Sequence, residues 1–433
     1  KKVFPGGDTR ASAHYLPYPL SIVEAQGCTV TDADGHQILD FMNNFTSLVH
    51  GHAHPDIVAA VQAQVALGSA YAAPSDHQLE LAELITSRVP SIDLMRFTSS
   101  GTEGTTMAIR CARAATGRQK IMKMEGGYHG SYELAEVSLV PMPNERGDLS
   151  APHSLAVDNS FPDSVLRDTV ICPYNQPDLA GALIDKHANN LAAVIVEPIL
   201  GSMGMIPATQ DFLTILRDKT ERHGVVLIFD EVITLRNSIG GMQEVHGIHP
   251  DLTCLGKIIG GGLPVGAVGG RAELMQLFSP EAPRPVMHAS TFSGNALTMA
   301  AGLAAMRCLQ QEDTDRINKL ASRLRHGFNH AFEQSGIRGR AMGAGSLTNL
   351  HFLDQPANDA RDAMQGMMAA GHMTRLLHLA MLTRGVMSAS RLMYCTSTAM
   401  IEADVDAAVT ALNESLAVLR PYIKKERPEL LIP

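Results

Sequence analysis

The sequence has no tryptophan, and aromatic residues of any kind make up only 5% of its 433 residues. It also lacks any apolar run near the roughly 18 residues that a membrane-spanning helix needs. No basic block is present, and the net charge is −9, whereas binding to nucleic-acid phosphates requires a positive surface. We therefore expect neither a membrane nor a nucleic acid as the partner.

Cysteine is scarce as well. The chain has six cysteines, none of them in a Cys-x-x-Cys pair, and most lie in apolar stretches. This pattern predicts buried free thiols and a cytoplasmic protein rather than a disulfide scaffold. The hydrophobic share of 45% and the charged share of 18% are typical of a globular protein with a sizeable core.

The middle of the chain alternates between strand-like and helix-like stretches. Helical patterns lie at 102–116 and 210–223. Strand patterns lie before, between and after them, at 94–99, 119–124, 191–196, 224–229, 252–255 and 266–269. This alternation predicts an α/β fold with a mostly parallel central sheet flanked by helices. In such sheets, ligands bind at the carboxyl ends of the strands.

The two ends of the chain have a different pattern. Short strands at 21–24 and 28–31 precede a turn at Asp34-Gly35, and long helical patterns follow at 313–334, 360–384 and 403–423. We expect a large domain at 55–315, and a smaller α+β domain built from residues 1–54 and 316–433.

A lysine and an aspartate are the first two candidates for chemistry. Lys257 stands between an apolar strand and three glycines, which allow the backbone to approach a ligand closely. Asp230 ends the strand 224–229, where a carboxylate requires a cationic partner, a metal or a helix N-terminus. A surface lysine and a simple helix cap are the alternatives.

Two glycine-containing segments follow successive strand patterns along the chain. Ser99-Ser100-Gly101-Thr102 begins a helix whose N–H groups could hold a phosphate, or Ser100 could act as a plain N-cap. Tyr128 and His129 lie among three glycines, in a loop suited to a planar ligand or to ordinary turn packing. An amine, a carboxylate, an anion site and an aromatic face are together what pyridoxal 5′-phosphate requires.

These segments resemble the class III, fold-type I pyridoxal-phosphate aminotransferases over essentially the whole chain. The resemblance is closest to the branch with glutamate-1-semialdehyde aminomutase and β-amino-acid transaminases. The motifs that carry it are Phe41, Gly51-His52-Ala53-His54-Pro55, Ser100-Gly101-Thr102-Glu103, Tyr128-His129-Gly130, Glu197-Pro198, Phe229-Asp230-Glu231-Val232, Gly256-Lys257 and Thr291-Phe292-Ser293-Gly294-Asn295.

The resemblance implies a role for each cofactor residue. Lys257 would form the Schiff base and shuttle the proton, and Asp230 would pair with the ring nitrogen. Val232 would pack on the ring face opposite Tyr128. The remaining cofactor-binding residues would be Ser100, Gly101, Thr102, His129 and Glu197, with Thr291 reaching the phosphate of the neighbouring subunit in a homodimer with shared active sites.

Two segments favour a transaminase over an aminomutase. Aminomutases have a Ser-Trp-Gly segment before the Gly-His-x-His-Pro turn, whereas this chain has Asn43-Asn44-Phe45-Thr46-Ser47 and no tryptophan. Near the C-terminal end, aminomutases carry a glutamate where this chain has residues 389–393. In β-amino-acid transaminases an N-terminal arginine binds the substrate carboxylate. Arg10 and Arg391 match such positions, with Phe45 as a wall of the pocket, although either arginine could instead form a surface ion pair.

The resemblance therefore implies a ping-pong transaminase that moves an amino group from an amine or (β-)amino acid to a keto acid. A 2,1-aminomutase is the nearest alternative. A decarboxylase, an epimerase or a non-catalytic cofactor-binding protein is the alternative from another class. We expect no metal, because no carboxylate or cysteine cluster accompanies His50, His52 and His54.

Overall fold

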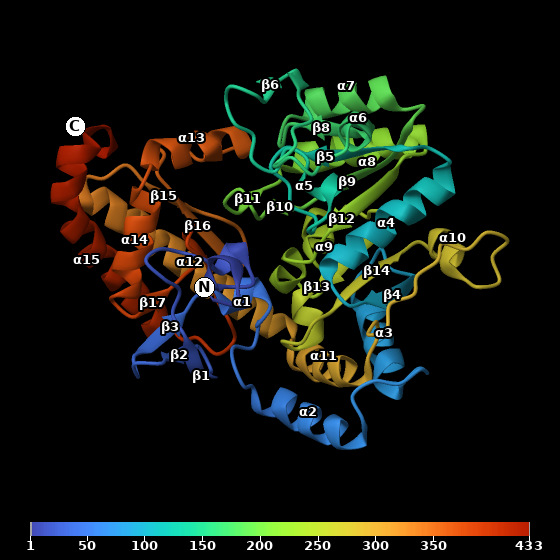
Figure 1. Cartoon of the computed structure of the whole chain (residues 1–433), viewed down its shortest axis with the longest axis horizontal. Coiled ribbons are helices and arrows are strands. Elements are labelled where there is room, and N and C mark those ends of the chain that lie inside the picture. The colour runs from blue at the N-terminus through green and yellow to red at the C-terminus, as the bar shows by residue number, and fades with distance from the viewer. Residues whose placement is uncertain (1, 433) are drawn as a thin grey trace. The chain divides into compact units, whose positions relative to one another are not determined.

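The computed structural model describes residues 2–432, and the chain divides into two compact units (Figure 1). The first unit consists of Lys1–His54, Asp315–Ala357 and Gln365–Pro433. The second unit consists of Pro55–Thr314 together with Asn358–Met364. The short segment Asn358–Met364 thus returns to the second unit from a part of the chain that otherwise belongs to the first.

A seven-stranded sheet in the second unit carries the candidate site (Figure 1). Its strands, in spatial order, are β4 (Leu94–Thr98), β14 (Gly266–Gly270), β13 (Leu252–Gly256), β12 (Val226–Asp230), β9 (Leu191–Val196), β5 (Lys120–Met124) and β8 (Thr169–Cys172). Strands β13, β12, β9, β5 and β8 pair in parallel. The predicted α/β fold with a mostly parallel sheet is confirmed.

Strand β14 is the exception, because it runs antiparallel to both β13 and β4. Residues 257–265 connect β13 to β14 through the short 3-10 helix η4 (Lys257–Gly260). A parallel crossover needs a dozen or more residues, so this short link reverses the direction of the chain. The antiparallel strand therefore follows from the position of Lys257 in a tight turn.

Helices pack against the large sheet. The helices of the second unit are α2 (Pro55–Leu67), α3 (Asp76–Arg88), α4 (Gly101–Thr116), α5 (Glu133–Glu136), α6 (Asp163–Asp168), α7 (Pro177–His187), α8 (Gln210–His223), α9 (Met242–His246), α10 (Ala272–Met275) and α11 (Ala296–Cys308). Met107, Ile109 and other α4 residues pack on alternate strand residues such as Ile195 and Ile228. Helices α7 and α8 pack against each other and against β8, β9 and β12. Two small hairpins complete this unit: β6 (Gly147–Asp148) with β7 (Ala151–Pro152), and β10 (Ile199–Leu200) with β11 (Ile206–Pro207).

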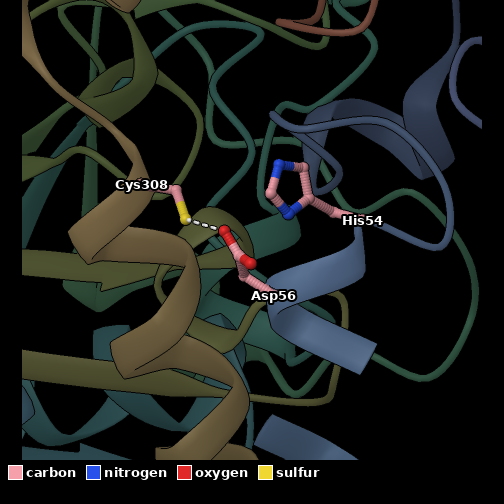
Figure 2. Close-up of side chains that lie close together, drawn as sticks. All are labelled: His54, Asp56 and Cys308. Carbon is pink, nitrogen blue, oxygen red and sulfur yellow. Dashed lines mark hydrogen bonds between the residues drawn. The ribbon is translucent and has the colours of Figure 1, made fainter. Parts of the chain in front are cut away.

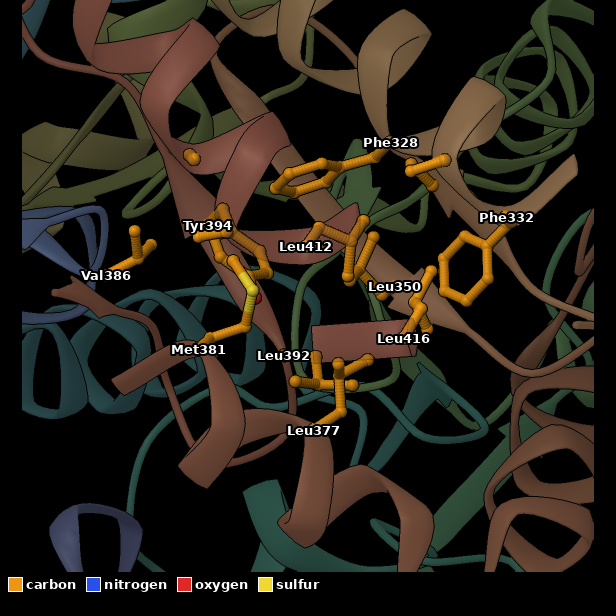
Figure 3. Packing of buried hydrophobic residues seen from close by; sticks show 14 of the residues in the cluster. Phe328, Phe332, Leu350, Leu377, Met381, Val386, Leu392, Tyr394, Leu412 and Leu416 are labelled. Atoms are coloured by element: carbon orange, nitrogen blue, oxygen red, sulfur yellow. The ribbon is translucent and has the colours of Figure 1, made fainter. Parts of the chain in front are cut away.

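The first unit has two small sheets. One contains β1 (Ile22–Gln26), β2 (Thr29–Asp32), β3 (Gln37–Asp40) and β17 (Val386–Met387), and the other contains β15 (Arg340–Met342), β16 (Leu347–His351) and β18 (Met393–Cys395). Its main helices are α12 (Gln311–Ser335), α14 (Met373–Leu382) and α15 (Glu402–Glu426). Their apolar sides meet in a core that includes Phe328, Phe332, Tyr394 and Leu412 (Figure 3).

The helical pattern at 360–384 corresponds to two helices rather than one. Helix α13 (Ala360–Ala370) ends before Gly371, and α14 begins at Met373. Gly371 has a φ of 54°, in the left-handed region that ends helices and that glycine enters without steric cost. Within residues 2–432 we find no helix that is both long and apolar enough to cross a bilayer. All six cysteines are free thiols.

Candidate functional site

Five strands of the large sheet end in candidate residues. Strand β4 leads to Ser100, β5 to Tyr128 and His129, β9 to Glu197, β12 to Asp230, and β13 to Lys257. The carboxyl ends of parallel strands meet at one edge of a sheet, which is where ligands bind in such folds. The sheet therefore gathers side chains from more than 150 residues of sequence, from Ser100 to Lys257.

The start of α4 has the geometry of an anion site. Ser100 is the N-cap, and its Oγ accepts a hydrogen bond from the Glu103 N–H at 3.2 Å. Glu103 Oε2 in turn accepts the Ser99 N–H at 2.8 Å. The first N–H groups of a helix have no acceptor within it, so those of Gly101 and Thr102 point outward. The Ser100 side chain thus acts as a cap, and the free backbone N–H groups, aided by the helix dipole, favour a phosphate.

Two glycines allow α4 to pack closely on strand β14. A Cβ at Gly104 would lie 2.8 Å from the carbonyl oxygen of Ala267, and a Cβ at Gly266 would collide with the carbonyl of Ser100. Real Cβ atoms do not approach backbone atoms so closely. Helix α4 can therefore begin beside the end of the sheet only because these positions lack a side chain.

Asp230 and His129 form a buried pair. Their exposed fractions are 5% and 2%, and His129 Nδ1 lies 2.9 Å from Asp230 Oδ2. Burial lowers the pKa of His129, so its neutral imidazole donates from Nδ1 to the carboxylate. Asp230 Oδ1 also accepts the Val232 N–H at 3.2 Å. This arrangement orients Asp230 and leaves lone pairs on its oxygens for a further donor.

Glu197 is the second buried carboxylate of the site. It accepts hydrogen bonds from the N–H groups of Tyr128 at 3.0 Å and Gly201 at 3.1 Å. Burial, followed by repulsion from Asp230, raises the pKa of Glu197 to about 8, while the ammonium of Lys257 acts in the opposite direction. Glu197 therefore fixes the backbone at Tyr128 and changes its charge near neutral pH.

Lys257 has a strained backbone. Its φ is 49°, in the left-handed region that residues with a side chain seldom enter. The lysine follows β13 directly and begins η4. A Cβ at its neighbour Gly256 would lie 3.3 Å from Val232 Cγ1, and a Cβ at Gly101 would lie 3.2 Å from the same side chain. Val232 thus lies between the first turn of α4 and the lysine.

Tyr128 completes the site on its exposed side. The side chain is 39% exposed, and its hydroxyl lies 3.1 Å from Ser131 Oγ. The Ser131 N–H donates to Thr102 Oγ1 at 3.3 Å. These contacts connect the aromatic loop with the start of α4, so a planar group with a phosphate could contact both segments at once.

Thr291 is exposed, and its neighbour Ser290 has its Oγ 3.1 Å from Ser99 Oγ of the same chain. An open cavity of ≈ 580 Å³ lies beside this segment, with Gln78, Phe97 and Ser290 in its lining. The predicted contact of Thr291 with a phosphate in a neighbouring subunit stays a prediction.

The three predicted substrate residues lie in the first unit. Arg10 Nη1 donates to Asn44 Oδ1 at 2.9 Å, and the guanidinium carbon lies 5.8 Å from the centre of the Phe45 ring. Arg391 occupies a tight turn in which the Leu392 N–H donates to the Ala389 carbonyl at 2.8 Å. Leu392 has a φ of 66°, so this turn is strained as well. The structure thus brings Arg10 and Phe45 together.

Sequence reasoning missed two cations of the second unit, one fully buried and one mostly buried. Lys123 is fully buried on β5, where its Nζ donates to the Val137 carbonyl at 2.6 Å, and burial lowers its pKa to about 7. Arg361 forms a two-bond ion pair with Glu125, at 2.7 Å and 3.0 Å. Glu125 begins the loop that carries Tyr128. No local pattern marks either residue, because a single Lys or Arg is normally exposed.

The histidines at the end of the first unit have protein partners. His52 Nε2 lies 2.7 Å from Asp40 Oδ2, and His50 Nδ1 lies 3.0 Å from Thr398 Oγ1. Figure 2 shows Asp56 and Cys308, which both belong to the second unit. The Cys308 thiol donates to Asp56 Oδ2 at 3.4 Å, and burial together with this carboxylate raises the pKa of the thiol. A metal requires the thiolate, so this bond opposes metal binding.

Comparison with known proteins defines the class of this chain. The family model "Aminotransferase class-III" matches residues 11–413, and the chain therefore belongs to the class III aminotransferases. It is a pyridoxal-phosphate-dependent enzyme. The resemblance inferred from the motifs is thus confirmed.

Individual relatives have different activities. A glutamate-1-semialdehyde 2,1-aminomutase of Desulfotalea psychrophila is 42% identical over 370 residues, which cover 84% of each chain. The crystal structure of an omega-transaminase from Sphaerobacter thermophilus is 44% identical, with a TM-score of 0.92, and the match covers 97% of this chain and 95% of the other. A beta-phenylalanine aminotransferase from Variovorax paradoxus is 35% identical, with a TM-score of 0.85 and coverage of 97% and 92%.

The residues of the second unit fit pyridoxal 5′-phosphate. The start of α4 offers N–H groups beside the Val232 side chain, which a Cβ on Gly101 would crowd. Asp230 is a buried carboxylate with lone pairs still available, and Lys257 ends the neighbouring strand. The donor set contains an anion site, an acid and an amine, which are the groups that this cofactor needs.

Proposed function

We propose that the protein is a transaminase that moves an amino group from an amine or (β-)amino acid to a keto acid in a ping-pong cycle. The observation that carries this proposal is segment 43–47. Aminomutases have a tryptophan there, whereas this chain has Asn44 and Phe45 beside the guanidinium of Arg10. A guanidinium suits the carboxylate of an amino acid, since it donates two parallel hydrogen bonds.

Each residue of the second unit has one task in the proposed cycle. The N–H groups of Gly101 and Thr102 would hold the phosphate, and Val232 and Tyr128 would pack on opposite ring faces. Bound pyridoxal phosphate supplies an electron-accepting ring and a carbon that carries the amino group. Asp230 would keep the ring nitrogen protonated, and neutral His129 orients this carboxylate through Nδ1.

Lys257 moves the proton. Its Nζ takes a proton from the carbon that bears the donor's amine and returns it on the other side of the transferred nitrogen. Glu197 accepts the Tyr128 N–H and so fixes the backbone there. When Glu197 is protonated it is neutral, so Asp230 has no second negative charge beside it. Arg10 and Arg391 bind the carboxylate of the donor or of the keto acid.

We further propose that the enzyme acts as a homodimer in the cytoplasm and that Thr291 reaches the phosphate of the neighbouring subunit. The exposed segment around Thr291 supports this arrangement. Met287 is 65% exposed and Phe292 is 61% exposed, and both lie close to Thr291 in the chain. Exposed apolar side chains of this size are typical of interfaces.

A donor panel tests the proposed reaction. We expect a β-amino acid or a simple amine to yield its carbonyl product only when pyruvate or 2-oxoglutarate is present, with absorbance changes at the cofactor. A matched assay follows glutamate-1-semialdehyde without any keto acid, because the aminomutase names of curated relatives favour that second candidate. Isomerisation without an acceptor, together with no transfer from any donor, would overturn the transaminase proposal. Release of carbon dioxide or racemisation instead would indicate a decarboxylase or an epimerase.

A further inference from the structure

Residues Asn43 to Thr46 form one turn of left-handed helix. Their φ angles are 47°, 46°, 55° and 75°, and none of these residues is a glycine. L-amino acids avoid this region because Cβ approaches the carbonyl, and they visit it as single residues rather than as runs. Asparagine tolerates it best, whereas Phe45 and Thr46 gain nothing from it. Strain of this kind persists only where the surroundings enforce it, and it gathers at functional sites.

The surroundings of this turn enforce it from several directions. Buried Asp40 accepts the N–H groups of Met42 at 2.8 Å and Asn43 at 3.0 Å through Oδ1, and its Oδ2 binds His52. The buried Asn43 amide donates to the Cys395 carbonyl at 3.0 Å. These bonds hold the turn at its base, and they leave the side chains of Asn44 and Phe45 at its tip.

The left-handed turn allows two consecutive side chains to meet one guanidinium. In a strand, neighbouring side chains point to opposite faces, so Asn44 and Phe45 could not both contact Arg10. Here Asn44 Oδ1 accepts one N–H of Arg10 at 2.9 Å, and the Phe45 ring lies 5.8 Å from the guanidinium carbon. A guanidinium has five N–H donors, so most of them stay available for a ligand.

We propose that Asn44 is a positioning residue that determines specificity for donors with a carboxylate. Asn44 holds the guanidinium of Arg10 in one orientation over Phe45, with its remaining N–H groups available to a carboxylate in paired hydrogen bonds. The neutral amide matters here, because it orients the cation without cancelling its charge. This inference rests on the proposed transaminase function, since it names the substrate class that the same site selects.

The test measures selectivity rather than activity alone. The donors are 3-aminobutanoate and 2-aminobutane, which differ by a carboxylate in place of a methyl group. Asn44→Gly removes the amide and suits the φ of 46°. We expect this variant to raise the KM for 3-aminobutanoate about 3- to 10-fold relative to the KM for 2-aminobutane, with kcat unchanged. This is the range for losing one hydrogen bond to a charged group that is partly exposed to water. Asn44→Asp should raise this KM further, because its carboxylate competes for Arg10.

Two further variants separate positioning from simple support of the fold. In an Arg10→Ala background, Asn44→Gly should have no added effect on selectivity. Ser47→Ala is the matched control: it removes a 3.0 Å bond to the Asn44 carbonyl without facing the guanidinium, and it should leave selectivity unchanged. Additive effects of Asn44→Gly and Arg10→Ala, or equal effects of Asn44→Gly on both donors, would overturn the inference.

Direct binding keeps the test independent of the reaction. Calorimetric titration of the holoenzyme with butanoate, and with butanamide as the uncharged control, should show weaker butanoate binding in Asn44→Gly and in Arg10→Ala. If the wild-type enzyme binds butanoate but transfers no amino group, the proposed function fails and the role of Asn44 stands. Unchanged butanoate affinity in Asn44→Gly would overturn the role of Asn44 alone.

Discussion

The partners of Asp230 described above are an imidazole and a backbone N–H, and both are neutral donors. Asp230→Asn should therefore preserve much of this local geometry and remove only the negative charge. We expect kcat to fall about 10²- to 10³-fold, as for other lost electrostatic contacts to a transition state, while the cofactor stays bound. Single-turnover kinetics and cofactor titration measure the two effects. Near-normal turnover would show that Asp230 serves only to hold Val232 and His129.

The raised pKa of Glu197 makes stability depend on pH. The folded protein keeps this proton up to about pH 8, whereas an unfolded glutamate loses it near its ordinary pKa of 4.5. Between these values the folded state binds more protons, so the free energy of unfolding falls as pH rises. We expect Glu197→Gln to remove much of this decline in the apoprotein, on the order of a few kcal/mol.

Urea unfolding of the apoprotein at pH 5, 6.5 and 8 measures the Glu197 effect. Exposed Glu133→Gln is the control and should follow the wild-type curve. Lys123 acts in the opposite direction at higher pH. Its lowered pKa of about 7 means that the unfolded state binds more protons from pH 7 to about 10.5, so its contribution to stability rises there. A wild-type decline unaltered by Glu197→Gln would contradict the assignment to Glu197.

At the scale of elements, the Arg361 ion pair connects the first turn of α13 to the loop of residues 125–130, which carries Tyr128. Its side chain is 11% exposed and that of Glu125 is 2% exposed, and Arg361 also donates to the Gly147 carbonyl at 3.1 Å. Arg361→Met should leave a buried carboxylate without its partner and cost about 3–5 kcal/mol of unfolding free energy. The cofactor should also bind more weakly, since Glu125 begins the loop of Tyr128.

A double variant and a control make the Arg361 prediction specific. Glu125→Met combined with Arg361→Met should recover most of the lost stability, because no buried charge remains. Arg384→Met breaks the more exposed pair with Glu414 and should cost less than about 1 kcal/mol. Chemical denaturation and cofactor titration are the measurements. If Arg361→Met and Arg384→Met lose the same free energy of unfolding, burial does not make the Arg361–Glu125 pair more important for stability than an exposed pair.

The elements show which features local sequence can predict. Helix α8 and strand β12 follow directly from periodicity, a Thr209 cap and a glycine stop at Gly224. The break between α13 and α14 depends on Gly371 adopting a positive φ, which a continuous apolar pattern conceals. The left-handed turn at Asn43–Thr46 could not be predicted, because the nearby Asp40 bonds leave no sequence pattern and the Asn43 bond to the Cys395 carbonyl depends on tertiary packing.

At the scale of the whole molecule, the proposal that two subunits share each cofactor site depends on Thr291. Its hydroxyl would form one hydrogen bond to a charged phosphate, so Thr291→Ala should weaken cofactor binding by roughly 1–3 kcal/mol. Thr291→Ser keeps the hydroxyl and should bind as the wild type does. Sedimentation at assay concentration measures the assembly in parallel. A fully active monomer would refute shared sites.

Much of the candidate site could be predicted, because its residues follow strands and strand ends are visible in the sequence. Lys257 and Asp230 stand out where apolar runs meet polar or glycine-rich segments. Arg361 and Lys123 do not, since their partners Glu125 and Val137 are brought close only by tertiary packing. The Ser100 side chain forms the helix cap, which is one of the two roles that the sequence left open.

The strand order has a consequence for the growing polypeptide. Strand β4, which leads into the start of α4, is at the edge of the sheet, and among the described residues it pairs with β14 alone. Strand β14 is also the last of the seven to be synthesised, at Gly266–Gly270. A ribosome-bound chain that ends before residue 266 has the lysine and the aspartate but no strand to join them to β4. With the proposed site, we therefore expect cofactor capture only after β14 has left the ribosome and inserted between β4 and β13.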